Sequence, residues 1–95
     1  ISLPAIEAVL ERHYPADSDK GPILAVEAAA DAQKPELVLF TIIDIERETA
    51  NSHIRQAGLS GLHNIRRVVK LSQMPLLGSG KTDYRALKKK LEEGI

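Results

Sequence analysis

Residues 73–84 read QMPLLGSGKTDY, a segment in which a glycine-flanked lysine lies between a strand-like run and a predicted helix start. Glycine lets the backbone turn tightly and approach a ligand closely, so we expect Gly78, Ser79 and Gly80 to shape this loop. A lysine held at such a turn, Lys81, supplies a compact positive charge for a phosphate or carboxylate. The segment therefore predicts a site for an anionic substrate. The local alternative is a solvated lysine in an ordinary loop.

The sequence GSGKT at 78–82 also resembles the end of a phosphate-binding P-loop, G-x-x-x-x-G-K-[ST]. That motif requires glycine six residues before the lysine, where this chain has Pro75. Only fourteen residues follow Lys81, too few for the remaining strands of a nucleotide-binding sheet. The spacing therefore argues against a P-loop.

The chain has 95 residues and 43% hydrophobic content, which predicts one domain over residues 1–95 with a mainly aliphatic core. It has no cysteine, and its three histidines show no ligand spacing with carboxylates, so we expect no metal site. The sequence has no apolar run of eighteen residues and no signal-peptide pattern. We therefore expect a cytoplasmic location.

Charge is divided unevenly along a chain whose net charge is zero. Residues 1–50 hold ten acidic and four basic side chains, whereas residues 51–95 hold three and nine. A basic second half favours an anionic partner. The chain begins at Ile1 with residues that already look like a helix entry, so we interpret it as a fragment of a longer protein.

The first half predicts a helix and two strands. Ser2 can cap a helix that buries positions 6, 9, 10 and 13 and ends before Pro15. Residues 23–28 and 36–43 read as strands, and the polar segment 31–35 between them indicates a hairpin turn.

The second half predicts a helix, a strand and a last helix. Asp44 is the expected N-cap of a helix that runs through Ala57, turns Ala57 inward and is followed by Gly58 as the C′ residue. Residues 65–71 predict a third strand. Thr82 or Asp83 is expected to cap a last helix that is apolar at positions 84, 87 and 91. The predicted fold is α+β, a small three-stranded sheet backed by helices in the order α-β-β-α-β-α.

The opposite face of the last helix is basic, with Arg85, Lys88, Lys89 and Lys90. These side chains either dock an acidic partner or form a solvated surface near the helix C-terminus, where cations are favourable. Nucleic acid is not an expected partner, because no aromatic residues are interleaved with the bases and the domain is neutral overall.

Three groups of residues match a known family: ISL and IE at 1–3 and 6–7, DAQK and LVLFT at 31–34 and 37–41, and QMPLLGSGK at 73–81 with Asp83. Nearly the whole chain resembles the C-terminal domain of the AMP-forming acyl synthetases, which include acyl-CoA synthetases, luciferases and peptide-synthetase adenylation domains. The marker is a terminal P-x-x-x-x-G-K pattern. The resemblance is strongest to the acyl-[acyl carrier protein] synthetase branch, which includes enzymes fused to a 2-acylglycerophosphoethanolamine acyltransferase.

The resemblance implies a mobile lid domain that swings over a large N-terminal adenylation domain. Lys81 would bridge a fatty acid carboxylate and the nucleotide during adenylate formation, and another face of the lid would serve thioester formation. ATP and Mg²⁺ would bind mainly to the N-terminal domain, so we expect no cofactor on this fragment and no ligase activity from it alone.

The implied acceptor is an acyl carrier protein, for which Arg85, Lys88, Lys89 and Lys90 are the docking candidates. A lysophospholipid substrate and an inner-membrane anchor are implied for a fused parent. Pro35 and Ile65 depart from the family pattern, where glycine and proline are usual. Two alternatives stay open: an acyl-CoA synthetase domain, and a non-catalytic module that binds an acidic partner through its last helix.

Overall fold

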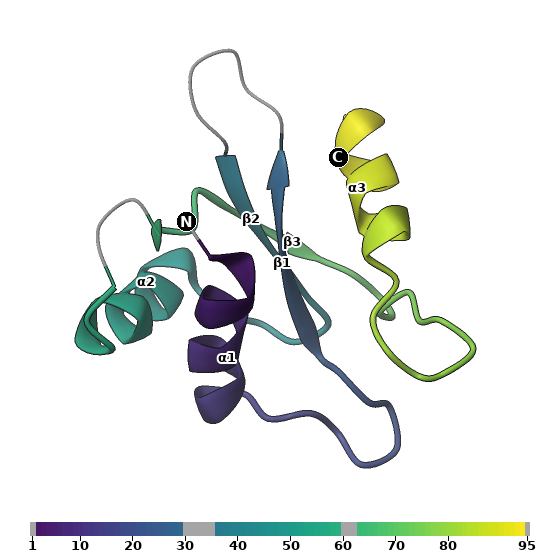
Figure 1. The fold of residues 1–95 in the computed structure, drawn as a ribbon, viewed down its shortest axis with the longest axis horizontal. Coiled ribbons are helices and arrows are strands. Elements are labelled where there is room, and N and C mark those ends of the chain that lie inside the picture. Colours follow the sequence, from purple (N-terminus) through teal and green to yellow (C-terminus); the bar gives the residue numbers. More distant parts are fainter. Residues whose placement is uncertain (1, 30–35, 60–62, 95) are drawn as a thin grey trace.

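The computed structural model describes residues 2–29, 36–59 and 63–94 (Figure 1). Within these ranges the helices and strands follow the predicted order α-β-β-α-β-α. Their bounds are α1 Leu3–His13, β1 Leu24–Ala29, β2 Glu36–Thr41, α2 Arg47–Gln56, β3 Arg67–Lys70 and α3 Tyr84–Glu92. The α+β fold predicted from the sequence is therefore confirmed.

The strands form one mixed sheet in the order β1-β2-β3. Strands β1 and β2 are antiparallel, with Leu24 opposite Thr41, which confirms the predicted hairpin pairing. The turn predicted at 31–35 lies outside the described residues. Strand β3 runs parallel to β2, as expected when a helix, here α2, carries the chain back to the same end of the sheet.

Helices α1 and α2 cover one face of the sheet, and α3 covers the other (Figure 1). Successive side chains of a strand point to opposite faces, so Leu24 and Val26 join the apolar cluster beneath α1 and α2, whereas Ala25 joins the cluster beneath α3. Ile54 of α2 and Phe40 of β2 are fully buried, one in each cluster. The chain therefore has an apolar core on both sides of its sheet.

Helix α1 begins as predicted, because the Ser2 hydroxyl accepts a hydrogen bond of 3.2 Å from the Ala5 N–H. The expected inward residues at positions 6, 9 and 10 are buried, but His13 is exposed. Its ring stacks on His53 of α2 with a centroid distance of 3.6 Å. Burial, and secondarily the charge of His13, lowers the pKa of His53, which favours a neutral His53 ring in this contact.

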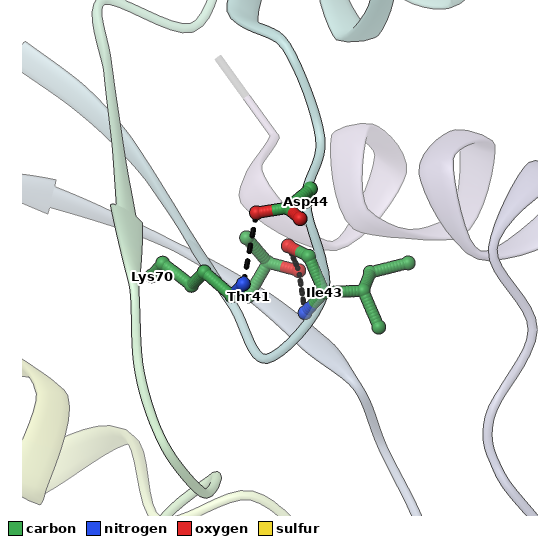
Figure 2. A network of polar contacts seen from close by, with 4 residues as sticks. All are labelled: Thr41, Ile43, Asp44 and Lys70. Atoms are coloured by element: carbon green, nitrogen blue, oxygen red, sulfur yellow. Dashed lines mark hydrogen bonds and ion pairs between the residues drawn. The ribbon is translucent and has the colours of Figure 1, made fainter.

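The prediction that Asp44 caps α2 is wrong. The helix begins three residues later at Arg47, after an N-cap residue, Glu46, whose side chain makes no capping hydrogen bond. Figure 2 shows Asp44 paired instead with Lys70, at the end of the neighbouring strand β3, with 2.8 Å between Oδ1 and Nζ. Between Asp44 and the helix, Ile45 is buried in the core and Glu46 has an extended backbone, so the helix does not start before Arg47.

The end of α2 confirms one expectation and corrects another. Gly58 follows the C-cap residue with a φ of +87°, as expected for a C′ glycine. Ala57 is exposed, not inward, because the helix has already ended at Gln56 and Ala57 is its C-cap residue.

Two predicted strands are too long. Strand β2 ends at Thr41, two residues early, where the Thr41 hydroxyl bonds to the backbone N–H and C=O of Ile43 and turns the chain (Figure 2). Strand β3 pairs with β2 over only four residues and begins after Arg66. In the described ranges, no helix has the length and apolarity needed to cross a membrane.

Candidate functional site

Residues 75–83, which we call the lysine loop, form a small hairpin. The Asp83 N–H donates to the Pro75 carbonyl at 2.9 Å, and the Leu77 N–H donates to the Lys81 carbonyl at 2.8 Å. A tight turn closes the hairpin through a 2.9 Å bond from the Gly80 N–H to the Leu77 carbonyl. The loop therefore has a defined, hydrogen-bonded backbone.

The two glycines of the lysine loop have different roles. Gly80 has a φ of +87°, a conformation that other residues rarely adopt, so the turn itself requires glycine there. Gly78 does not have a positive φ, and a Cβ atom added to it would meet no heavy atom within 4 Å. The folding of the loop thus explains Gly80 but not Gly78.

Both ends of the lysine loop are anchored. Met74, just before the loop, is buried in the cluster beneath α3, and Thr82 is only 8% exposed. Asp83 caps α3 by accepting a 3.2 Å bond from the Ala86 N–H, which confirms one of the two predicted caps. Tyr84 then ties the helix to α1 through a hydrogen bond from its hydroxyl to Glu7. Lys81 is therefore carried on a support fixed at both sides.

Lys81 itself is exposed. Within the described parts of the chain, its ammonium group has no hydrogen bond and no carboxylate within ion-pair distance. It borders a cavity of about 300 Å³ between the lysine loop and the segment that follows α1. The other lining residues are Glu11, Tyr14, Ala16, Pro22, Ile23, Thr82 and Tyr84. The cation is thus free to meet an external anion.

Two titratable neighbours in this cavity have shifted pKa values. Burial, reinforced by the negative charge of Glu7, raises the pKa of Glu11. Burial raises the pKa of Tyr84 far above its ordinary value, and the hydrogen bond to Glu7 and the nearby carboxylates add to this shift. The Tyr84 hydroxyl therefore stays protonated near neutral pH and acts as a hydrogen-bond donor, not as a base.

Three of the four basic residues predicted on the outer face of α3 are exposed. Arg85, Lys88 and Lys89 are exposed, but Lys90 is partly buried. On the apolar side Leu87 is fully buried, whereas Tyr84 is 39% exposed and lies at the margin of the predicted face. None of these four basic side chains forms an ion pair with another described residue.

A polar cleft of about 690 Å³ was not predicted from the sequence. Three arginines line it, Arg47 and Arg55 from α2 and Arg66 from the residue before β3, together with the carboxylates of Glu36 and Glu48. Asn64 also lines it, and its Oδ1 atom is buried without a hydrogen-bond partner among the described residues. Arg47 and Arg55 share one helix, whereas Arg66 comes from the segment before β3, which the parallel pairing of β3 with β2 places beside α2. We call this surface the arginine cleft.

Metal ligands do not gather in the described ranges, where no three His, Asp or Glu side chains are close enough to hold an ion.

No protein-family model matches the sequence.

Solved structures share the fold over nearly the whole chain. An acyl-CoA synthetase from Brucella canis matches with a TM-score of 0.77 at 22% identity, over 98% of this chain and 18% of that one. The amide bond synthetase McbA from Marinactinospora thermotolerans matches with a TM-score of 0.73 at 21% identity, over 95% of this chain and 18% of that one. An AMP-forming acyl-CoA synthetase/AMP-acid ligase II-like protein from Dyadobacter fermentans gives 0.65 at 22% identity, over 96% and 27%.

These neighbours are much longer than the chain, which spans less than a third of each. Their likeness shows the fold of this chain, which each of these proteins contains as one part of a longer chain.

Proposed function

We propose that this chain is the C-terminal lid domain of an ATP-dependent fatty acyl-[acyl carrier protein] synthetase, and that Lys81 serves acyl-adenylate formation. The observation that carries the proposal is an exposed lysine that pairs with none of the described residues, on an anchored hairpin within a fold that AMP-forming synthetases share. The P-x-x-x-x-G-K pattern of residues 75–81 adds to that support.

The chemistry of adenylation explains the need for such a lysine. A fatty acid carboxylate attacks the α-phosphorus of ATP, an oxygen–phosphorus bond forms, and pyrophosphate leaves. Two anions approach each other in this step, and a fixed cation offsets their repulsion as negative charge redistributes. Lys81 would hold the carboxylate and nucleotide together, and the open space around Gly78 would let the backbone approach them.

The rest of the active site would belong to a larger N-terminal adenylation domain. Mg²⁺ would neutralise the phosphates there, and most nucleotide contacts would lie there too. The lid would close for adenylation and then rotate to present another face for thioester formation. A parent fused to a 2-acylglycerophosphoethanolamine acyltransferase would also act on lysophospholipid and be anchored in the inner membrane with this domain on the cytoplasmic side.

The first test is to assay the full-length parent and the isolated 95-residue chain side by side. We expect fatty-acid-dependent exchange between ATP and pyrophosphate from the parent and none from the chain, because one hairpin cannot enclose ATP, Mg²⁺ and a fatty acid away from water. Hydroxamate formation from a fatty acid by the chain alone would contradict the proposed division of labour.

Two surfaces are candidates for the thiol acceptor. The basic residues of α3 suit an acidic carrier protein, which is the acceptor we propose. The arginine cleft favours a second candidate, coenzyme A, because arginines form bidentate hydrogen bonds with phosphate groups. A non-catalytic module that binds an acidic partner through α3 is the alternative if the parent has no synthetase activity.

Charge reversal separates these acceptors. Changing Lys88, Lys89 and Lys90 to glutamate in the parent is expected to slow acyl transfer to carrier protein several-fold at low salt and to weaken its salt dependence. Adenylate formation should be unchanged. The matched control reverses Arg47, Arg55 and Arg66 instead. If transfer to carrier protein slows only in the arginine control, the acceptor binds at the arginine cleft and not at α3. If transfer is unchanged in the lysine variant, the basic face of α3 is only a solvated surface.

A further inference from the structure

A second small cavity, of about 270 Å³, lies between the first turns of α1, strand β1 and the start of α3. Its lining consists of Leu3, Pro4, Glu7, Val26, Glu27 and Tyr84. Two carboxylates face this space together with apolar and aromatic surface, and the lining has no basic side chain. We call it the carboxylate cavity.

Glu27 is the unusual residue of this cavity. This charged residue in the middle of strand β1 is only 6% exposed. Its Oε1 atom accepts a 3.1 Å hydrogen bond from the adjacent Ala28 N–H, and its Oε2 atom has no hydrogen bond with the described residues. No lysine or arginine of the described chain forms an ion pair with it. A buried carboxylate without a cation is costly, so an external cation would relieve that cost.

Glu7 already has partners. Its Oε2 atom accepts a 2.8 Å bond from the Val26 N–H, and its Oε1 atom accepts the hydroxyl proton of Tyr84. Strand β1 is at the edge of the sheet, and Glu7 and Glu27 occupy the outward N–H groups of Val26 and Ala28. A partner strand therefore cannot pair with this part of the edge. What the cavity can accept is an inserted side chain.

We propose that the carboxylate cavity binds an arginine side chain of a partner polypeptide. Its volume is below the ~300–1,000 Å³ of pockets for drug-sized ligands, and it suits a single side chain. A guanidinium group has five donors for Glu27, and its flat face packs well on an aromatic ring such as that of Tyr84. The apolar walls at Leu3 and Pro4 suit the methylene stem.

A metal ion fits this cavity poorly. Both oxygen atoms of Glu7 already accept hydrogen bonds, and the described residues supply no third carboxylate or histidine close enough to complete a site. The proposed role of Lys81 in adenylation is independent of this inference, because the carboxylate cavity and the cavity beside Lys81 share only Tyr84 among their described lining residues.

The test titrates the chain with N-acetyl-L-arginine methylamide and follows the backbone amide signals of Val26 and Ala28 by NMR. We expect a saturable shift, at least a tenfold loss of affinity in Glu27→Gln, and unchanged affinity in the control Glu11→Gln, whose carboxylate lines the other cavity. Glu27→Asp keeps the charge but withdraws the carboxylate, so it should also bind several-fold more weakly. The lysine analogue should bind several-fold more weakly than the arginine probe.

Each other outcome overturns the proposal. Shifts that rise linearly with concentration, or that match those caused by sodium chloride, would show ionic strength and not binding. Equal affinity in Glu27→Gln would remove Glu27 from the site, and equal affinity for the lysine analogue would remove the preference for guanidinium. The remaining amide signals of each variant report whether its fold is intact, and Glu27→Asp keeps the test decisive if Glu27→Gln alters the fold.

Discussion

Replacing Lys81 with alanine in the full-length parent is expected to reduce acyl-adenylate formation by ~10²–10³, the scale seen when one preorganised stabilising group is removed. Lys81 is the only cation of the lysine loop, and no described side chain neutralises it, so nothing nearby could replace its charge. The measurement is ATP–pyrophosphate exchange with a fatty acid substrate. The fold of the Lys81→Ala variant should be intact, because the lysine side chain is exposed and makes no contact that the loop needs.

The second half-reaction provides the control for this substitution. Thioester formation from synthetic acyl-adenylate should survive in Lys81→Ala, because the lid would by then have rotated and carried the lysine away. Lys81→Arg should rescue adenylation poorly, since a planar fork does not replace a compact ammonium group. Equal loss in both half-reactions would assign Lys81 to a structural role, and no loss in either would end the catalytic assignment.

The sequence correctly predicted helix ends that are set by residues only a few positions away. Ser2 and Asp83 cap helices as expected, because a short polar side chain reaches an N–H three residues ahead whatever the rest of the fold does. Asp44 has the same chemistry but failed as a cap. Its position depends on the burial of Ile45 and on Lys70, which is 26 residues away in sequence.

In the candidate site, too, the sequence predicted the features that depend on contiguous residues and missed those that depend on distant ones. The glycines and Lys81 were predicted because they are contiguous, and the structure adds the hairpin bonds and the anchoring at Thr82. The hydrogen bond between Tyr84 and Glu7 joins residues 77 positions apart, so no spacing rule could reveal it. The arginine cleft and the carboxylate cavity were missed for that reason.

The site's support depends on a buried polar residue of α2. Asn51 is 8% exposed, and its side chain binds both backbone groups of Ile65: its Oδ1 accepts the Ile65 N–H at 2.6 Å, and its Nδ2 donates to the Ile65 carbonyl at 3.0 Å. Ile65 is fully buried two residues before β3. This pair of bonds replaces sheet pairing in the irregular segment that leads into the strand, which in turn leads to the lysine loop.

Asn51→Ala should therefore lower the free energy of unfolding of the chain by about 2–6 kcal/mol, since each of two buried backbone groups loses its partner at ~1–3 kcal/mol. That is a large share of the ~5–15 kcal/mol typical of a folded domain. Urea unfolding monitored by circular dichroism measures the change.

Gln56→Ala is the matched control, because its exposed amide bonds only to Ser52 on the same helix, and it should change stability by less than ~0.5 kcal/mol. Asn51→Asp should be destabilising as well, because an ionised carboxylate can accept the Ile65 N–H but would face the Ile65 carbonyl without a proton to donate. If Asn51→Ala were no more destabilising than Gln56→Ala, water would have to satisfy Ile65, and the segment before β3 would not depend on α2 for its position.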